Sequence, residues 1–159
     1  MLKTLAAAAF AASLTLSTAA ADMAPRAGFE VIPTNFAYAA LLERLKSAIA
    51  AEKMGLVTQA GPTEVAKAKL GETIPGNRVI GVFRPDFAVR AVRLSTAAMI
   101  EAPIRFYVTE NADGTATLSY KTPSFVFGAY EDDGGAELMA LAAELDEIFA
   151  AIAARATAE

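Results

Sequence analysis

The sequence predicts a small α+β domain, with an antiparallel sheet that carries helices on one face, behind a cleavable secretion signal. Three observations lead to this class: scattered short strand patterns, one clear hairpin pattern at 103–122, and a long amphipathic helix pattern near the C-terminus. Strands and helices that mix without regular alternation are typical of α+β folds. Without the signal the chain has the length of one domain, which we place at residues 29–155.

Residues 1–21 have the composition of a signal peptide. Lys3 precedes an apolar, Ala-rich run from Leu5 to Leu16, and small residues follow up to Ala21. A basic start, an apolar stretch and small residues before a cut are the three parts of such a signal. The alternative is an uncleaved anchor, but the apolar run is shorter than the roughly twenty residues that span a bilayer. We therefore expect a periplasmic or secreted protein, with no membrane insertion after cleavage.

The N-terminal half of the domain alternates short strands with helices. We expect a flexible leader at 22–28, strands at 29–32, 56–59 and 79–83, and helices at 36–54, at 62–70 and from 86 to about 98. The first helix is the clearest of these, since Leu41, Leu45 and Ile49 recur every four residues and so share one face. Gly55 follows it at the position where a helix end favours glycine.

Residues 103–122 carry the strongest local pattern, which predicts an antiparallel hairpin. Apolar and polar residues alternate on both sides of an Asp-Gly turn. The two apolar sets share one face only if the loop has an odd number of residues, because side chains alternate with a period of two. A three-residue loop at 112–114, with Gly114 in the left-handed conformation, meets this requirement. The opposite face then carries Arg105, Tyr107, Thr109, Thr117, Ser119 and Lys121.

The C-terminal part predicts a packed connection and then a long helix. Residues 122–130 are apolar without a period, and we expect one helical turn there. Gly134 and Gly135 mark the entry to a helix from about 136 to 154. The apolar residues of this helix form one stripe, as in a helix that packs on a core. The stripe consists of Leu138, Leu141, Leu145, Ile148 and Ile152.

Composition excludes several kinds of chemistry. The chain contains no Cys and no His, so disulfides, thiol nucleophiles and Ser-His-Asp triads are excluded. Zinc, haem and blue-copper sites depend on the same two ligands. We therefore expect no cofactor and no metal, and we name no catalytic residue. With 14 basic and 18 acidic side chains the chain is mildly acidic, which gives no general attraction to nucleic acid.

The order of several motifs resembles that of a known family. The motifs are a strand running into a proline-led helix at 78–88, a strand with a proline near its start at 101–108, an Asp-Gly turn at 113–114 and a strand end with Tyr and Pro at 119–123. Together they resemble the family called domain of unknown function 302, over about residues 29–155. The resemblance implies a small α+β fold with an antiparallel sheet and is compatible with a homodimer, but it implies no activity. Arg84 stands where that family usually has Asn.

The candidate ligand-binding residues are Arg105, Tyr107, Lys121 and Arg84. An Arg and a Lys beside a Tyr could bind the carboxylate or phosphate of a small ligand. The alternative is an ordinary solvent-facing sheet surface, on which charged residues and Thr are common. Arg84 belongs to a basic segment, 78–105, whose charges could instead pair with the acidic C-terminal part or meet it across a dimer.

These observations predict an exported, non-catalytic binding or interaction module that forms a homodimer. Its further partner would be a small anionic ligand or an envelope protein. One alternative is an enzyme that works without His or Cys, which requires a concave site that gathers Arg105, Tyr107 and Lys121 with an acidic residue. A second alternative is a small-ligand carrier, which requires a cavity lined by residues 123–130.

The predicted signal can be tested directly, and we expect a mature chain that begins at Asp22 or Ala21. Both cuts are expected because signal peptidase needs small residues at the third and first positions before the cut. Ala19 and Ala21 supply them for one cut, and Thr18 and Ala20 for the other. The intact mass of the protein isolated from its native envelope or medium measures the cut. A full-length mass in the membrane fraction would contradict the prediction.

Overall fold

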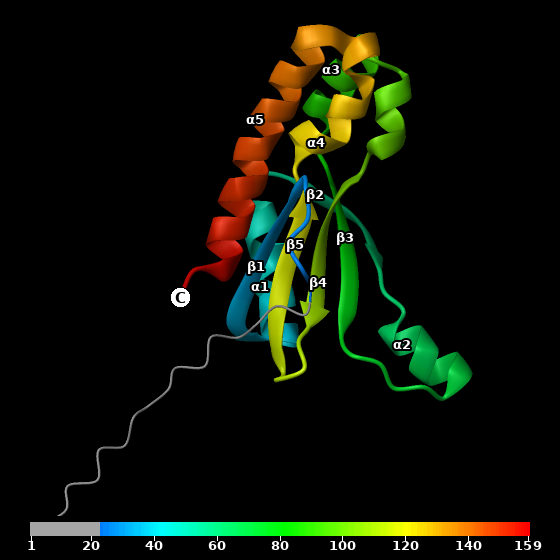
Figure 1. The fold of residues 1–159 in the computed structure, drawn as a ribbon, viewed down its shortest axis with the longest axis vertical. Coiled ribbons are helices and arrows are strands. Elements are labelled where there is room, and N and C mark those ends of the chain that lie inside the picture. Colours follow the sequence, from blue (N-terminus) through cyan, green and yellow to red (C-terminus); the bar gives the residue numbers. More distant parts are fainter. Residues whose placement is uncertain (1–22) are drawn as a thin grey trace, which may run out of the picture.

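A five-stranded antiparallel sheet forms the centre of the protein. The computed structural model describes residues 23–159, and the predicted signal peptide lies outside the described residues. Within them, the strand order is β1-β5-β4-β3-β2, and two long helices cover one face of the sheet (Figure 1). In this part of the chain no helix is long and apolar enough to cross a membrane. The predicted α+β class, with helices on one face, is confirmed.

The elements follow the predicted order along the chain. The strands are β1 (Phe29–Ala37), β2 (Gly55–Ala60), β3 (Asn77–Phe83), β4 (Ile104–Glu110) and β5 (Thr115–Lys121). The helices and helical turns are α1 (Tyr38–Ala51), α2 (Thr63–Val65), η1 (Ala66–Leu70), α3 (Pro85–Leu94), η2 (Ala97–Glu101), α4 (Pro123–Phe127), η3 (Gly128–Tyr130) and α5 (Glu131–Thr157). Each predicted strand and helix has its counterpart here, although β1 is much longer than the weak alternation at its start indicates.

The predicted helix at 86–98 is wrong at its C-terminal end. α3 ends at Leu94, and Ser95 has extended dihedral angles, φ −152° and ψ 114°. The hydroxyl of Ser95 accepts a hydrogen bond from the backbone N–H of Ala98 at 3.0 Å and donates one to Asp133. A serine that bonds nearby backbone groups favours a turn over a helix interior. The chain therefore makes a separate 3₁₀ turn, η2, before β4.

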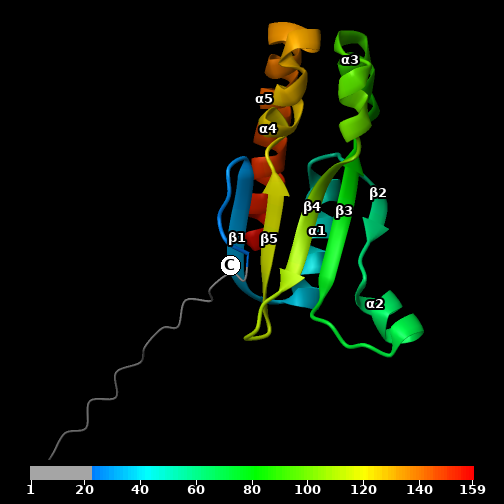
Figure 2. The ribbon, with the colours of Figure 1, turned by 45° about the vertical axis from the view of Figure 1, so that its right-hand side comes forward.

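The core lies between the sheet and the helices α1 and α5, which stand behind the strands in Figure 2. At its centre Phe149 of α5 stacks on Phe106 of β4, with the ring centroids 4.5 Å apart and an interplanar angle of 15°. Tyr120 of β5 contacts both rings, at 5.2 and 5.6 Å. Aromatic pairs of this kind contribute about 0.5–1.5 kcal/mol each beyond the area they bury. The cluster holds the last helix on the two central strands.

The β4–β5 hairpin has the predicted register. Phe106 pairs with Tyr120, and the backbone N–H of Asn111 donates to the carbonyl of Thr115 at 2.8 Å. This pairing leaves the predicted three-residue loop between them. Gly114 in that loop has a φ of +83°, which glycine adopts without a steric penalty. The apolar residues of both strands therefore face the helices together.

Two helical regions extend beyond the sheet at opposite ends (Figure 1). At one end α3, η2 and α4 stand beside the first part of α5, next to the start of β4 and the end of β5. Phe87 of α3 and Phe127 of α4 are buried there. At the other end α2 and η1 project on the connection between β2 and β3, and they expose Val65 and Leu70. The first of these regions borders the candidate site.

Gly135 breaks α5 near its start. Its φ of 61° and ψ of −162° lie far from helical values, in a region that is essentially restricted to glycine. The regular part of the helix thus begins at Ala136, which agrees with the helix predicted from about 136. Nothing within 4 Å would clash with a Cβ atom at Gly135, so its backbone conformation alone requires glycine.

We expect Gly135→Ala to destabilise the fold by roughly 1–3 kcal/mol, the cost of a strained backbone conformation. Urea denaturation followed by circular dichroism measures this free energy. Gly128→Ala is the matched control, because Gly128 has a helical φ of −57° and equally open space for a Cβ atom. Equal stabilities of the two variants would show that α5 can begin without the break.

Candidate functional site

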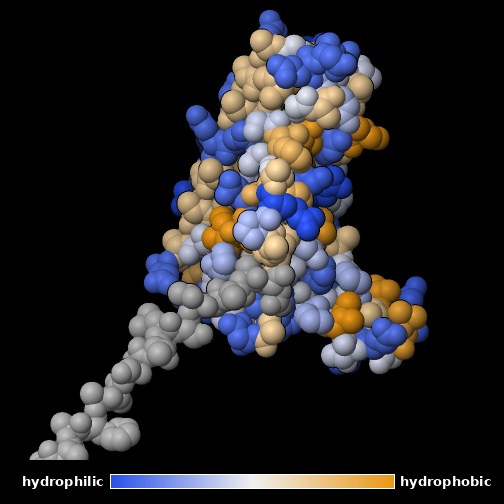
Figure 3. Space-filling model, viewed as in Figure 1, coloured by the Kyte–Doolittle hydropathy of each residue, from blue (hydrophilic) through white to orange (hydrophobic). Residues whose placement is uncertain are grey.

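A groove on the open face of the sheet brings together Arg105, Tyr107 and Lys121, three of the four predicted ligand-binding residues. Its volume is about 370 Å³, within the range of small-molecule sites. Figure 3 shows this face of the molecule, where hydrophilic side chains lie between more apolar areas. The other lining residues are Phe29, Val79, Glu101, Ile104, Ser119, Tyr120 and Val126. The groove therefore combines charged groups with an apolar lining.

Two cations from adjacent strands line this groove. The β4–β5 ladder ends at the pair of Phe106 and Tyr120, and Arg105 and Lys121 are the residues next to this pair on the two strands. Like charges on adjacent strands repel each other and can destabilise a sheet. A bound anion between the two side chains would relieve this repulsion.

Neither cation is neutralised by a close acidic partner in the described part of the chain. The guanidinium of Arg105 lies 4.0 Å from the carboxylate of Glu101, at the limit of an ion pair. The ammonium of Lys121 has no ion pair among residues 23–159, and it lies 5.7 Å from the centroid of the Phe29 ring. Both side chains are exposed. They are thus available to an incoming anion.

Glu101 is the acidic group of the groove, and a tyrosine holds it in place. The hydroxyl of Tyr130 donates a hydrogen bond to Oε1 of Glu101 at 2.8 Å. This bond raises the pKa of Tyr130, because ionisation would set two negative charges side by side. Glu101 was not among the predicted ligand-binding residues. It precedes Arg105 by four residues, but only the turn η2 shows that both reach the same groove.

Two hydroxyl residues on this face have structural roles. Thr117 and Ser119 are buried, with exposed fractions of 0% and 1%, although the hairpin pattern places them on the polar face. The hydroxyl of Thr117 donates to the side-chain oxygen of Asn111 at 2.9 Å, and that of Ser119 reaches the backbone oxygen of Tyr107 at 3.5 Å.

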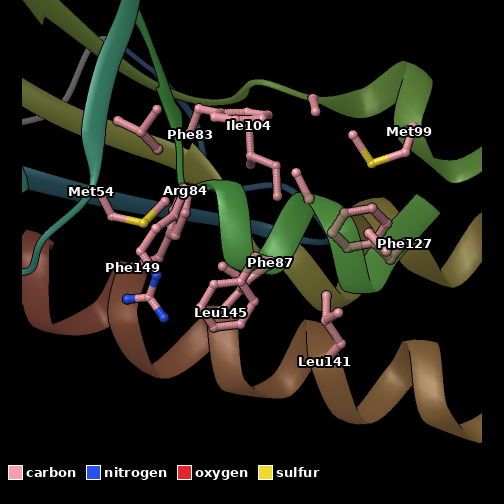
Figure 4. A pocket seen from close by; sticks show the side chains of 14 residues that line it. Met54, Phe83, Arg84, Phe87, Met99, Ile104, Phe127, Leu141, Leu145 and Phe149 are labelled. Atoms are coloured by element: carbon pink, nitrogen blue, oxygen red, sulfur yellow. The ribbon is translucent and has the colours of Figure 1, made fainter. Parts of the chain in front are cut away.

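Arg84, the fourth predicted residue, lies apart from the other three. Its guanidinium donates to both carboxylate oxygens of Asp86, at 2.8 and 3.1 Å, and stands 4.2 Å from the centroid of the Phe87 ring. These hydrogen bonds lower the pKa of Asp86. Arg84 lines a small apolar cavity between β3, α3 and α5 (Figure 4). Its charge is already paired, unlike the charges in the groove.

The basic segment and the acidic C-terminal helix pair within the chain at one point. Arg90 of α3 donates two hydrogen bonds to the carboxylate of Glu144 on α5, at 2.7 and 2.6 Å. This agrees with the pairing that the sequence suggested for the basic segment. Across residues 23–159 no group of three or more carboxylates is arranged to hold a metal ion.

Comparison with known proteins identifies the family of this chain. A family model described as "Domain of unknown function DUF302" matches residues 30–154. The chain belongs to the DUF302 family. The crystal structure of an uncharacterized conserved DUF302 protein from Bacillus stearothermophilus is similar, with a TM-score of 0.73 and 20% sequence identity over 82% of this chain and 99% of that chain. No curated protein matches.

The resemblance predicted from the sequence motifs is therefore confirmed. At 20% identity the structural likeness shows that this DUF302 protein shares the fold of the Bacillus stearothermophilus protein. The fold alone does not indicate a function, because one fold can carry many unrelated sites. The side chains in the groove are what indicates one.

The two cations of the groove predict an effect on stability. We expect Lys121→Gln to stabilise the fold by roughly 0.2–1 kcal/mol at low ionic strength, because it removes one of two like charges on adjacent strands. The gain should vanish in 1 M salt, where the Debye length is about 3 Å. Urea denaturation at the two salt concentrations measures it. Lys69→Gln, at an exposed position of η1, is the control. A destabilised Lys121→Gln variant would show that contact with Phe29 outweighs the repulsion.

Proposed function

We propose that this DUF302 protein is a non-catalytic module that binds small organic anions on the open face of its sheet, outside the cytoplasm. The observation that carries this proposal is that Arg105 and Lys121 line one groove without a close acidic partner. An arginine can grip a carboxylate or phosphate with two parallel hydrogen bonds, and a lysine adds a point charge. The signal-like sequence of residues 1–21 supports the location in the periplasm or the medium.

The charges of the groove favour a monoanion. Arg105 and Lys121 contribute two positive charges and Glu101 contributes one negative charge, so the lining carries one net positive charge. A monoanion would neutralise this charge, whereas a dianion would leave Glu101 facing an excess of negative charge. Because charge-assisted hydrogen bonds are the strong polar contacts of such sites, the carboxylate group would lie between the two cations.

The rest of the groove suits an apolar group on the same ligand. Phe29, Val79 and Val126 line it beside the charged residues, and the Phe29 ring is flanked by the cations of Arg26 and Lys121 at 5.5 and 5.7 Å. Cation–π contacts of this kind hold a ring in a fixed orientation. An organic acid with an apolar body would thus contact both parts of the lining.

Catalysis without His or Cys is the second candidate function. It required a concave site that gathers Arg105, Tyr107 and Lys121 with an acidic residue, and the groove gathers these three with Glu101. Tyr and Lys can act as general acids or bases, and carboxylates can too. We favour binding over catalysis because Glu101 is held by Tyr130 and faces Arg105 rather than a nucleophile.

We also propose that the protein forms a homodimer through the free side of β2. β2 pairs with β3 on one side and stands at the edge of the sheet, and Val57 on it is 51% exposed. An unpaired edge strand readily pairs with a second strand. Native mass spectrometry of the unchanged protein and of Val57→Lys tests this arrangement. We expect a dimeric mass for the unchanged protein and a monomeric mass for the variant. A monomeric mass for both would exclude the arrangement.

Anion binding can be tested by isothermal titration with monocarboxylates, a dicarboxylate and phosphate. We expect a monocarboxylate to bind in a 1:1 ratio, and Arg105→Gln to weaken it about tenfold or more, the loss of a charge-assisted hydrogen bond. Arg93→Gln, at an exposed position of α3, is the matched control and should leave binding unchanged. Equal weakening by both variants would point to general charge attraction. Chemical conversion of the added acid would favour the enzyme.

A further inference from the structure

A small apolar cavity lies next to the groove, where the end of the sheet meets α3, α4 and α5. Its volume is about 40 Å³. In Figure 4, Phe83 and Ile104 lie on the sheet side of the cavity, Leu141 and Leu145 on the side of α5, and Met54 and Met99 at its two ends. The carrier alternative expected residues 123–130 to line a cavity, and of these residues Phe127 of α4 lines this one.

The cavity has the character of a site for an apolar group. Protein interiors are close-packed, and voids larger than a water molecule are few. A space of this size could take about three atoms of carbon or water size, but water needs several polar partners. The lining is apolar except for Arg84, whose guanidinium is already bonded to Asp86. Met54 and Met99 add adaptability, since unbranched thioether side chains adjust to different shapes. A short linear alkyl chain fits such a space better than a ring or a branched group.

The wall between groove and cavity lies at Ile104. Ile104 lines both of them. On either side of it, consecutive residues divide between the two spaces. Glu101 and Val126 line the groove, whereas their neighbours Ala102 and Phe127 line the cavity. Ile104, the first residue of β4, thus lies at the boundary between the charged groove and the apolar cavity.

We propose that the groove and the cavity form one two-part site for an amphipathic monocarboxylate with a short linear tail. The carboxylate lies between Arg105 and Lys121, and the tail passes Ile104 into the cavity between Met54 and Met99. The proposal rests on the function proposed above, because the cavity alone would not orient such a ligand. It adds the class of ligand and the path of the tail.

Linear monocarboxylates from acetate to octanoate test this arrangement. Affinity should rise by roughly threefold to fourfold with each methylene that enters the cavity, and then stop rising when the cavity is full. Nuclear magnetic resonance of protein labelled in its methionine methyl groups measures affinity and position in one titration. Met54 and Met99 should shift with the longer acids, and acetate should leave them unchanged.

A pair of variants on α3 locates the tail. Ala88 lines the cavity and is half-buried, so Ala88→Leu should fill the cavity and remove the gain in affinity with chain length, while acetate binds as before. Val89→Leu changes the neighbouring exposed residue and should keep the gain. Ile104→Val, which thins the wall, should strengthen binding of the longer acids, and it keeps the test open if Ala88→Leu does not fold.

The outcomes separate this proposal from the function on which it rests. Equal affinities for acetate and octanoate, with no methionine shifts, would overturn the two-part site and leave anion binding in the groove intact. A gain with chain length that survives in Ala88→Leu would place the tail on the open sheet and would also overturn it. No binding of any acid to the unchanged protein would overturn both proposals.

Discussion

The stacking of Phe149 on Phe106 is the contact on which the arrangement of this protein depends. It joins the last helix to a central strand, and Tyr120 of the neighbouring strand completes the cluster. Burial raises the pKa of Tyr120 to about 12, as expected for a phenol held in an apolar core. Because side chains in a strand alternate, the choice of these faces for the core sends Arg105 and Lys121 to the open face.

Some cations of this protein are paired with acidic residues, whereas the two cations of the groove have no close acidic partner among the described residues. Arg90 joins α3 to α5 through Glu144, and Arg84 is bound to Asp86 next to it. These exposed pairs add little stability individually, but the charges of Arg84 and Arg90 are already neutralised by them. In the groove Arg105 has only a distant acid, and Lys121 of the adjacent strand lines the same groove. Two like charges on adjacent strands repel each other, and a bound anion would offset this repulsion.

The groove and the cavity meet at the end of the sheet where β4 begins and β5 ends. η2 supplies Glu101, α4 supplies Val126 and Phe127, and α3 closes the cavity. None of these helical pieces is long, and each is positioned by the core beneath it, through buried residues such as Phe87 and Ala98. A site built on short segments between strands and a long helix can change side-chain positions without a change of fold, which suits a groove and a cavity that share the lining residue Ile104.

Local pattern alone determined much of this protein. Alternation in residues 103–122 specified the hairpin, its odd loop and the face that carries Arg105, Tyr107 and Lys121, because a period of two leaves no other way to bury the apolar sets. The motif order specified the DUF302 family. The pairing of Arg84 is also local, since Asp86 is two residues away, but a hydrophobic period does not show it. Tertiary structure decided what depends on distant partners. Asp133 accepts a hydrogen bond from Ser95 at the end of α3, and Tyr130 holds Glu101 in the groove. These side chains meet only when segments distant in the sequence pack together, and periodicity carries no information about such contacts.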